Sequence, residues 1–483
     1  MKPKYIAAIE IGSSRIKGIV GSIDETSAIT VLAIEEVDSG GTVRYGRVQN
    51  AREVSTMVNE IVRRLENNPK VAPGQISAVF VANGGRSLSS AMAEANVKLD
   101  GEAEVTQQTL ERLRKEARYN LATDRDVLAI ASRKFIVDNS ERSVKKIIGT
   151  FGRNIHGEFT IVTTSPENRR ALERVSIESH GQSIPREYLT RLLAQSEMAL
   201  TDSDRALGCL FIDFGAETTT AAIFRDGVLQ AAITLPMGSA NITRDLSSGL
   251  SITQECAENI KVTKGQAMAE RVNMQVPDDE TREIINYVSA RTGEIIANIN
   301  NFIELAGFKP AELAAGAVIA GGGSHLKGLP EMLEAQTKLK VRPAAVDSSI
   351  LMPDRNMNAS HHFDVISLLR YAAAHSDISC ISFPEPVAVA VERPVQATTS
   401  HPQDAYRQPA GKRKVIPGLN DSNLLQDDMD EEVVEQPDNV NEDPDLDDIK
   451  PAATSNETRK NLLRRFRDWI APTVDNIDAE DEE

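Results

Sequence analysis

The stretch AAIEIGSSRIKGIVG (residues 7–21) reads as an apolar strand, a turn in which a carboxylate precedes a glycine by two positions, and a second strand. The stretch LFIDFGAETTTAAIF (residues 210–224) repeats this plan about 200 residues later. A carboxylate-x-glycine turn is common in unrelated β-hairpins, so either stretch alone is a weak signal. Two copies in one chain favour a duplicated unit whose turns carry function.

A third segment, AVIAGGGSHLKGLP (residues 317–330), reads as a buried strand that runs into three glycines and then a helix beginning near Pro330. A plain strand-to-helix turn needs one glycine. Consecutive glycines at Gly321, Gly322 and Gly323 let a backbone approach a flat or charged ligand closely. The segment therefore predicts a ligand contact.

A further candidate lies between these segments. Ser251, Ile252, Thr253 and Gln254 have capping-box spacing, which predicts that a helix opens there. Glu258 and Lys261 follow three residues apart on one face of that helix. Alone such a pair is usually a surface ion pair, but its place before the glycine-rich turn favours a functional role.

Composition limits the classes of protein and partner. The chain has 483 residues, a net charge of −17 and three widely separated cysteines. The cysteines exclude a CxxC metal site or a disulfide framework and suit a reducing compartment. Neither a membrane-spanning run nor a signal-peptide core is present, so we expect a chain that is neither integral to a membrane nor secreted.

The negative charge is concentrated near the C-terminus. Residues 427–448 carry 12 acidic and no basic side chains, residues 459–468 carry five basic and one acidic, and residues 475–483 carry six acidic. The rest of the chain is nearly neutral, so we expect no nucleic-acid partner. Residues 391–456 are poor in residues that can repay the entropy of folding, which predicts a disordered linker.

Two carboxylate-bearing turns that face each other would form a cleft for the phosphates of a nucleotide. Backbone N–H groups and the hydroxyls of Ser13, Ser14 and Thr218 to Thr220 would hold the oxygens, and Lys17 would add a positive charge. Glu10 and Asp213 are predicted to face Mg²⁺ through its waters. Because GxxxxGK[ST] is missing and no GxGxxG follows the first strand, a P-loop and a dinucleotide fold are unsupported.

The order of two phosphate turns, a Glu-x-x-Lys helix and a glycine-rich turn resembles the superfamily of actin, heat-shock chaperone ATPases and sugar kinases. Within it the chain is similar to FtsA, the family of bacterial actin-like cell-division proteins. The resemblance covers about residues 4–380, with a separate match at 458–470. It includes the segments 235–246 and 258–261.

The resemblance implies an α/β, two-lobed actin-like ATPase fold of duplicated RNase H-like subdomains, with ATP in the cleft between the lobes. The first phosphate loop would comprise Glu10, Gly12, Ser13, Ser14 and Lys17. The second would comprise Asp213, Gly215 and Thr218. Glu258 and Lys261 would flank the adenosine, with Gly321, Gly322 and Gly323 beneath it.

The same resemblance implies the division into parts. Subdomain 1A would comprise residues 1–84, 165–204 and 346–390, subdomain 2A residues 205–249 and 306–345, and subdomain 2B residues 250–305. An FtsA-type inserted subdomain at 85–164 would serve filament contacts and later divisome recruitment. The linker at 391–456 would lead to an amphipathic membrane-targeting helix at 457–471 and an acidic tail at 472–483.

One position departs from the family pattern. Relatives usually read Asp-x-Gly-Gly-Gly-Thr in the second phosphate loop, whereas this chain has Ala216 and Glu217 before Thr218. A carboxylate beside phosphate is unfavourable because like charges repel. We expect weakened nucleotide binding, weak or absent ATP hydrolysis and a chiefly structural role, unless Glu217 points away, which the sequence leaves open.

The C-terminal basic segment has helical amphipathic spacing. Leu462, Leu463, Phe466, Trp469 and Ile470 share one face, and basic residues including Arg464 and Arg465 mostly populate the remainder. This pattern predicts a helix that lies on an anionic membrane surface, with the acidic extension moderating attachment. The alternative is a helix that docks on its own core or in a partner's groove.

The resemblance also implies partners. Filaments of such subunits would sum weak membrane attachments through effective concentration. The filament would tether the tubulin-like ring protein FtsZ to the cytoplasmic face of the inner membrane at the division site. The FtsZ C-terminal peptide would dock on residues 250–305 near Arg291 and Glu294. The alternatives are a sugar or acetate kinase and a chaperone-like ATPase of the same superfamily.

Overall fold

The computed structural model describes residues 3–138, 140, 143–144, 146–268, 279–354 and 357–383. The predicted linker, membrane-targeting helix and acidic tail, with Leu462, Leu463, Arg464, Arg465, Phe466, Trp469 and Ile470, lie outside the described residues.

A five-stranded mixed sheet forms the centre of the part that we call lobe 1. Its order is β14-β7-β1-β2-β3. An antiparallel meander comprises β1 (Lys4–Ile11), β2 (Arg15–Ile23) and β3 (Ile29–Asp38), while β7 (Val79–Asn83) and β14 (Arg186–Thr190) continue the sheet in parallel with β1. Most of β1 is buried and apolar, as expected for a central strand covered on both faces.

A second sheet repeats this order and forms the centre of lobe 2. Its meander comprises β15 (Cys209–Phe214), β16 (Thr219–Arg225) and β17 (Val228–Leu235), and β18 (Ala317–Ala320) and β19 (Val341–Pro343) run parallel to β15. The strand order is again three, two, one, four, five when counted along each half of the chain. The duplication predicted from the two hairpins is confirmed.

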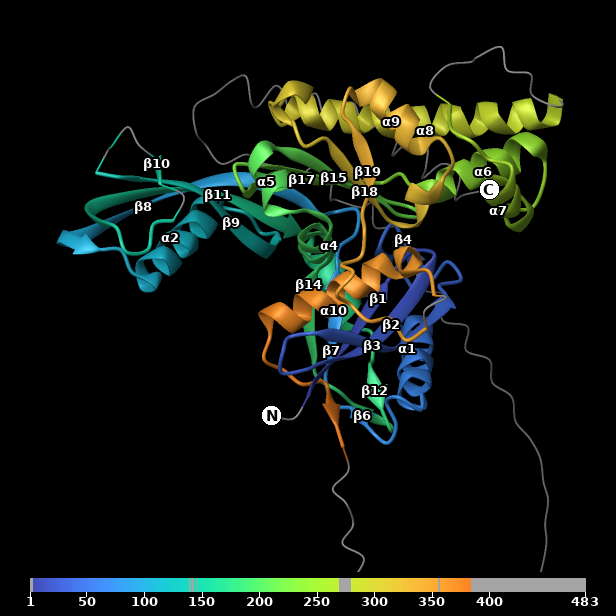
Figure 1. Ribbon diagram of the computed structural model, residues 1–483, viewed down its shortest axis with the longest axis horizontal. Helices are drawn as coiled ribbons and strands as arrows, with labels where there is room; N and C mark the ends of the chain where they lie inside the picture. Colours follow the sequence, from blue (N-terminus) through green and yellow to red (C-terminus); the bar gives the residue numbers. More distant parts are fainter. Residues whose placement is uncertain are drawn as a thin grey trace, which may run out of the picture. The chain divides into compact units, whose positions relative to one another are not determined.

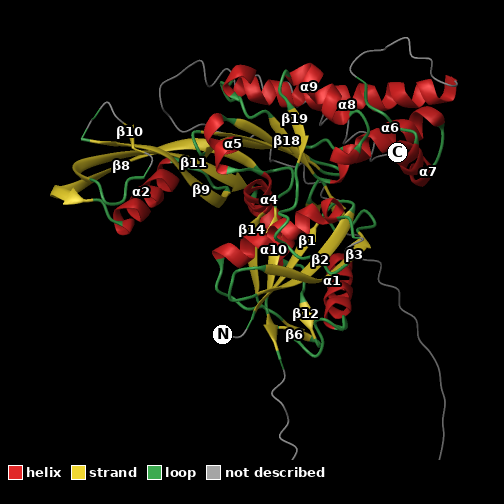
Figure 2. Cartoon of the chain, in the orientation of Figure 1, coloured by secondary structure: helices red, strands yellow, loops and turns green. Residues whose placement is uncertain are grey.

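An inserted set of strands extends the sheet of lobe 2. The strands β8 (Ser89–Glu104), β9 (Asp126–Val137), β10 (Ser143–Val144) and β11 (Phe151–Thr164) continue it in the order β10-β9-β11-β8-β17. Helix α2 (Gln107–Asn120) packs on β8 and β11, as Figure 2 shows. Thr106 caps this helix, and Leu110, Leu113 and Ala117 form its buried face, as predicted.

Helices cover the sheets in both lobes (Figure 1). Lobe 1 carries α1 (Ala51–Glu66), α3 (Pro166–Glu173), α4 (Arg191–Ala199) and α10 (Phe363–His375). Helix α5 (Asp202–Leu207) packs beside β16 of lobe 2. Lobe 2 also carries α6 (Ser239–Leu250), α7 (Gln254–Thr263), α8 (Asp279–Leu305) and α9 (Leu329–Thr337). Among the described helices, none combines the length and apolarity needed to cross a membrane.

Short elements complete the described chain. The two-residue strands are β4 (Val43–Arg44), β5 (Arg47–Val48), β6 (Gln75–Ile76), β12 (Glu178–Ser179), β13 (Gln182–Ser183) and β20 (Ile381–Ser382). The 3-10 helices are η1 (Pro310–Glu312), η2 (Gly322–His325) and η3 (Ala359–His362).

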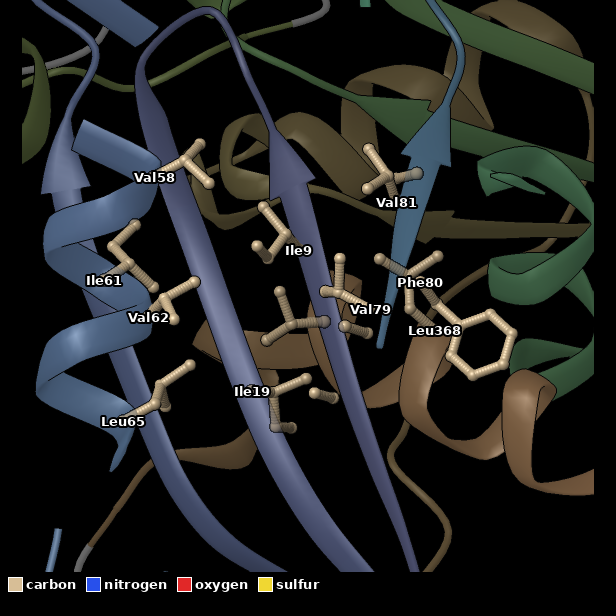
Figure 3. Packing of buried hydrophobic residues seen from close by; sticks show 14 of the residues in the cluster. Ile9, Ile19, Val58, Ile61, Val62, Leu65, Val79, Phe80, Val81 and Leu368 are labelled. Carbon is tan, nitrogen blue, oxygen red and sulfur yellow. The ribbon is translucent and has the colours of Figure 1, made fainter. Parts of the chain in front are cut away.

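Each lobe has an apolar core of its own. In lobe 1, Val58, Ile61, Val62 and Leu65 recur at helical spacing on α1 and point toward the strands that bear Ile9 and Ile19 (Figure 3). In lobe 2, Ile295, Ile296 and Ile299 of α8 belong to a cluster with Leu210 and Ile212 of β15. A third buried cluster joins Leu192 of α4 to Phe211 of β15, so the two units also pack against each other.

One predicted helix start is wrong by two residues. The capping-box spacing placed the cap at Ser251, but Thr253 is the residue whose side chain accepts a hydrogen bond from Cys256 N–H at the start of α7. Ser251 instead ends α6 in a left-handed conformation, with φ of 54°. Two helices meet there: Ser251 ends α6, and Thr253 caps the start of α7.

Candidate functional site

The two predicted phosphate turns have the same backbone geometry. Gly12 N–H donates to Arg15 O at 3.0 Å, and Gly215 N–H donates to Thr218 O at 2.8 Å. The strands that flank the turns also pair in equivalent register, with Glu10 opposite Lys17 and Asp213 opposite Thr220. The repeat in the sequence is therefore a repeat of backbone structure, and it places one carboxylate at the same point of each turn.

Both turns need glycine for their own closure. A Cβ atom on Gly12 would lie 2.8 Å from Arg15 O and from Glu10 Oε2, and a Cβ atom on Gly215 would lie 2.8 Å from Thr218 O. Such contacts are too short for any side chain. The glycine of the carboxylate-x-glycine pattern is thus explained by the turn itself, before any ligand is considered.

A cavity of about 580 Å³ lies where the two turns meet, which is within the usual size range for small-molecule sites. Its lining includes every residue that the resemblance assigned to the two phosphate loops and the adenosine: Glu10, Gly12, Ser13, Ser14, Lys17, Asp213, Gly215, Thr218, Glu258, Lys261, Gly321, Gly322 and Gly323. Segments that are far apart along the chain and belong to both lobes thus contribute to one cavity.

An arginine connects the two carboxylates of the turns. The guanidinium of Arg191 lies 2.9 Å from Glu10 Oε1 and 3.4 Å from Asp213 Oδ2. Glu10 and Asp213 are only 5% and 4% exposed. Burial raises the pKa of Glu10 to about 7, and the positive charge of Arg191 opposes this shift. Burial likewise raises the pKa of Asp213, again against the effect of Arg191.

The sequence analysis missed Arg191 and its neighbour Gln195. Arg191 opens α4, and Gln195 follows one turn later, where its side chain is buried and opposes the rise in the pKa of Asp213. Neither residue stands in a recognisable motif. The one available signal was an arginine at the end of a parallel strand, where ligand-binding residues gather in α/β folds.

The charge of Lys17 is paired within the protein. Its Nζ lies 2.8 Å from Asp364 Oδ2 of α10 and donates to His361 O at 2.9 Å. Burial lowers the pKa of Lys17, but Asp364 outweighs this effect, so that the pKa is raised overall. Lys17 lines the cavity as a cation that already has an anionic partner, which the sequence analysis did not foresee.

The hydroxyls of the second turn are only partly available. Thr219 Oγ1 donates to Met237 O at 2.8 Å, and Thr220 Oγ1 pairs with Thr234 Oγ1 at 2.9 Å. Both belong to the β16–β17 pairing, and neither lines the cavity. The prediction that Thr218 to Thr220 together face the phosphates is therefore wrong for Thr219 and Thr220, because strand pairing uses their hydroxyls.

Glu217 points away from the cavity. Its Oε2 accepts a hydrogen bond from the backbone N–H of Tyr45 at 2.6 Å, and its Oε1 accepts one from Arg44 Nε at 3.0 Å. Both donors belong to the β4–β5 hairpin of lobe 1. Of the two possibilities that the sequence left open, the structure shows the second: this carboxylate points away and links the second turn to the opposite lobe.

Lys261 and Glu258 form a network at the other end of the cavity. Lys261 Nζ donates to Ser239 O at 3.1 Å, Thr243 Oγ1 at 2.9 Å and Glu258 Oε2 at 2.7 Å. Burial lowers the pKa of Lys261, and Glu258 opposes this shift. An ammonium group has three N–H donors, and these three acceptors within the protein use all of them. Lys261 can therefore offer a ligand only its aliphatic stem.

The three consecutive glycines have different roles. Gly321 has φ of 85°, and a Cβ there would lie 2.4 Å from Asp213 Oδ1, so the turn itself requires glycine. A Cβ on Gly323 would lie 3.1 Å from Ser239 Cβ. A Cβ on Gly322 would meet no protein atom within 4 Å, although Gly322 lines the cavity. Gly322 is the one glycine of the three that the fold leaves open toward a ligand.

The predicted partner residues lie on α8, away from the cavity lining. Arg291 binds Asp245 of α6 through two nitrogens, at 2.7 and 2.9 Å, and Glu294 Oε2 through a third at 2.6 Å. The hydrogen bond with Asp245 is the main reason that the pKa of Arg291 is raised. The pair therefore takes part in packing α8 against α6, and its role toward a partner stays a prediction.

The described residues do not fit the predicted magnesium site. Carboxylate oxygens such as those of Glu10 and Asp213 suit Mg²⁺, but both groups contact the Arg191 guanidinium. Within the described part of the chain, no group of three or more His, Cys, Asp or Glu side chains could hold a metal ion. A cation is thus already present where the metal was expected.

Two family models match this chain. One, described as cell division protein FtsA, matches residues 210–374, and the other, described as the SHS2 domain inserted in FtsA, matches residues 85–163. Together the two matches cover about half of the chain.

Similar proteins agree with the family models. A cell division protein FtsA of Porphyromonas gingivalis is 26% identical over 358 residues, which are 71% of this chain and 74% of the relative. Another from Neisseria meningitidis serogroup B is 27% identical over 369 residues, or 73% of this chain and 86% of the relative.

A solved structure, the PilM-PilN type IV pilus biogenesis complex, matches with a TM-score of 0.55 at 14% identity. The match covers 77% of this chain and 99% of the other. At this identity the likeness concerns the fold alone. Together with the repeated strand order and the inserted domain, it confirms the predicted α/β actin-like fold class.

Proposed function

Because this chain belongs to the FtsA family of cell-division proteins, we propose that it binds ATP in the cavity between its lobes and tethers the FtsZ ring to the cytoplasmic membrane. The observation that carries the ATP site is the convergence of the two turns, the Glu258–Lys261 pair and the three glycines on one cavity. The kinase and chaperone alternatives have no comparable support, since the family matches concern cell division.

The two ends of the cavity suit the two ends of the nucleotide. At one end, the backbone of both turns, the Ser13 and Ser14 side chains and Lys17 line the space for phosphates. At the other end, Ile242 and Val262 add apolar surface beside Lys261, which suits a base and ribose. ATP therefore lies with its phosphates between Glu10 and Asp213 and its adenosine near Gly322.

Gly322 provides the sharpest test of this placement. A Cβ there meets no protein atom within 4 Å, so we expect Gly322→Leu to keep the fold and to fill the space for adenosine. We expect an ATP dissociation constant, measured by titration calorimetry on the full chain, at least about tenfold higher than in the unaltered protein. Unchanged ATP affinity would place the nucleotide elsewhere.

A control separates the cavity from general effects on stability. Gly293 lies within α8, outside the cavity lining, where an added Cβ contacts only the flexible ends of Met332 and Gln336. Gly293→Ala therefore leaves ATP affinity unchanged. Thermal unfolding of both variants establishes that they remain folded.

Membrane attachment depends on the segment 457–471. Its amphipathic spacing supports a helix at an anionic lipid surface, and polymerisation of ATP-bound subunits adds the weak attachments together. In co-sedimentation with anionic liposomes, the full chain pellets, while a chain that ends before Thr458 and the Trp469→Glu variant stay in solution. Val474→Glu, the same kind of change outside the helix, pellets normally. Equal pelleting of all four proteins contradicts the anchor.

The FtsZ C-terminal peptide binds lobe 2 near the exposed side of α8 and α6. Arg291 and Glu294 lie there, and Glu294 is the partner whose replacement leaves the bidentate Arg291–Asp245 contact in place. Glu294→Lys weakens peptide binding in fluorescence anisotropy, whereas Glu283→Lys on the same helix does not. Equal affinity in both variants would place the peptide on another surface.

A further inference from the structure

We propose that the guanidinium of Arg191, rather than a divalent metal ion, supplies the positive charge between the two turns, so that ATP binds this site without requiring Mg²⁺. This inference rests on the proposed ATP site. It concerns which cation serves that site.

The geometry of Arg191 suits this role. One nitrogen lies 2.9 Å from the carboxylate of lobe 1 and another lies 3.4 Å from the carboxylate of lobe 2. A guanidinium carries five N–H donors in a rigid planar group, so it can bind two carboxylates and still present donors to a third group. Arg191 also lines the cavity, at the point where phosphates would enter between the turns.

Burial makes a cation at this point necessary. Glu10 and Asp213 are almost completely buried, and the Arg191 side chain is 15% exposed. Two buried carboxylates that face each other without a counter-charge are strongly unfavourable. Lys17, another cation that lines the cavity, is engaged by Asp364 and by a backbone carbonyl, so it cannot take the place of Arg191.

The fold holds the guanidinium in position. Arg191 is the first residue of α4, directly after the parallel strand β14. Gly84 lies beside it: a Cβ on Gly84 would be 3.5 Å from Arg191 Nε and 3.6 Å from Cζ. The backbone there closely borders one side of the guanidinium, while the two carboxylates bind its nitrogens. A side chain held from several directions is preorganised for a ligand.

A hydrated Mg²⁺ ion would need the same oxygens. Magnesium keeps several of its waters and binds through one or two carboxylates together with substrate phosphates. In this structure both carboxylates are partners of Arg191. The arginine therefore takes over the neutralising role that the metal ion was predicted to have, and ATP phosphates meet a guanidinium.

The test measures the ATP dissociation constant of the full chain twice, once with millimolar Mg²⁺ and once with EDTA, by titration calorimetry. For the unaltered chain we expect the two values to agree within about threefold. For Arg191→Gln we expect ATP binding in EDTA to be at least about tenfold weaker than with Mg²⁺, because the carboxylates then need a metal ion. Arg191→Met, which also removes the charge, serves if the glutamine variant does not fold.

Arg342→Gln is the matched control, because Arg342 also pairs with a carboxylate, that of Asp204, but lies outside the cavity lining. We expect this variant to have the same ratio of ATP dissociation constants, in EDTA relative to Mg²⁺, as the unaltered chain. Three results overturn the inference. If the unaltered chain needs Mg²⁺, or if the Arg191 variants remain insensitive to Mg²⁺, Arg191 is not the cation that ATP uses, and the ATP site still stands. If ATP binds under neither condition, the proposed site fails as well.

Discussion

The two turns of the duplicated unit share a backbone but not a chemistry. Both close with the same N–H to carbonyl bond, and both carry a buried carboxylate at the same position. Where lobe 1 has Ser14, lobe 2 has Glu217, and where lobe 1 has Lys17, lobe 2 has Thr220. Only in lobe 1 does the residue opposite the carboxylate bring a charge into the cavity.

The side chains of the two turns therefore make different contacts. The first turn brings hydroxyls and a cation to the cavity, whereas the second turn uses Glu217 to bind the β4–β5 hairpin and Thr220 to pair with Thr234. Duplication supplied two equivalent backbones. The side chains differ: Ser13, Ser14 and Lys17 of the first turn line the cavity, whereas Glu217 of the second turn binds the opposite lobe.

If the backbones are equivalent, the two glycines must be equally necessary. Gly12→Ala and Gly215→Ala each place a Cβ 2.8 Å from a carbonyl oxygen of their own turn. We expect each to lower the free energy of unfolding by about 3 kcal/mol, the upper part of the usual range for overpacking. Urea unfolding of both variants measures this. A large loss in one and none in the other would break the equivalence.

The carboxylates differ in a way that pH reveals. Burial raises the pKa of Glu10 from 4.5 to about 7, so the folded protein holds a proton there that the unfolded chain has released. Stability from this group is therefore present below pH 4.5 and lost as the pH rises toward 7, by about 3 kcal/mol. Glu10→Gln removes this part of the pH dependence in urea unfolding.

A matched carboxylate checks that assignment. Glu53 is an exposed acid on α1, and Glu53→Gln keeps the pH profile of the unaltered chain between pH 4.5 and 7. If the profile of Glu10→Gln is the same as that of Glu53→Gln, the buried carboxylate is not the group responsible.

Equivalent positions in the two hairpins have unequal effects on the ligand. Lys17→Met removes a cation that lines the cavity and weakens ATP binding about tenfold, which is roughly 1.4 kcal/mol. Thr220→Val, at the matching position of lobe 2, removes only a hydrogen bond within the sheet and leaves ATP affinity unchanged. Calorimetric titration compares the two. Equal losses would mean that both turns bind phosphate through these side chains.

The smallest effect concerns Glu217. Glu217→Gln keeps the shape but weakens the hydrogen bonds to Tyr45 N–H and Arg44, so we expect a loss of about 1 kcal/mol in unfolding free energy. ATP affinity stays within about twofold, because the side chain points away from the cavity. A clear gain in ATP affinity would mean that this carboxylate does repel the phosphates.

Local features of the site were predictable. The carboxylate-x-glycine turns, the capped helix α2 and the glycine run at 321–323 follow from short-range chemistry, namely turn closure, capping and the conformational freedom of glycine. The position of the cap of α7 was missed because Ser251 and Thr253 both have capping side chains, and the end of the preceding helix decides between them.

Long-range features were not predictable from motifs. Arg191 meets Glu10 and Asp213 only because β14 lies beside β7 in the sheet of lobe 1 and delivers α4 to the cavity. The direction of Glu217 depends on a hairpin that lies 172 residues earlier in the chain. A local sequence motif cannot reveal a contact between residues that are so far apart along the chain.

The amino-acid order by itself determined that the chain has two copies of one strand-turn-strand unit, and it predicted a glycine-rich turn and a nucleotide site. Those properties depend on residues a few positions apart, where the backbone leaves few choices. Tertiary structure alone decided which charges neutralise one another. Buried carboxylates and cations choose partners by proximity across lobes, and that proximity arises only when both sheets have formed.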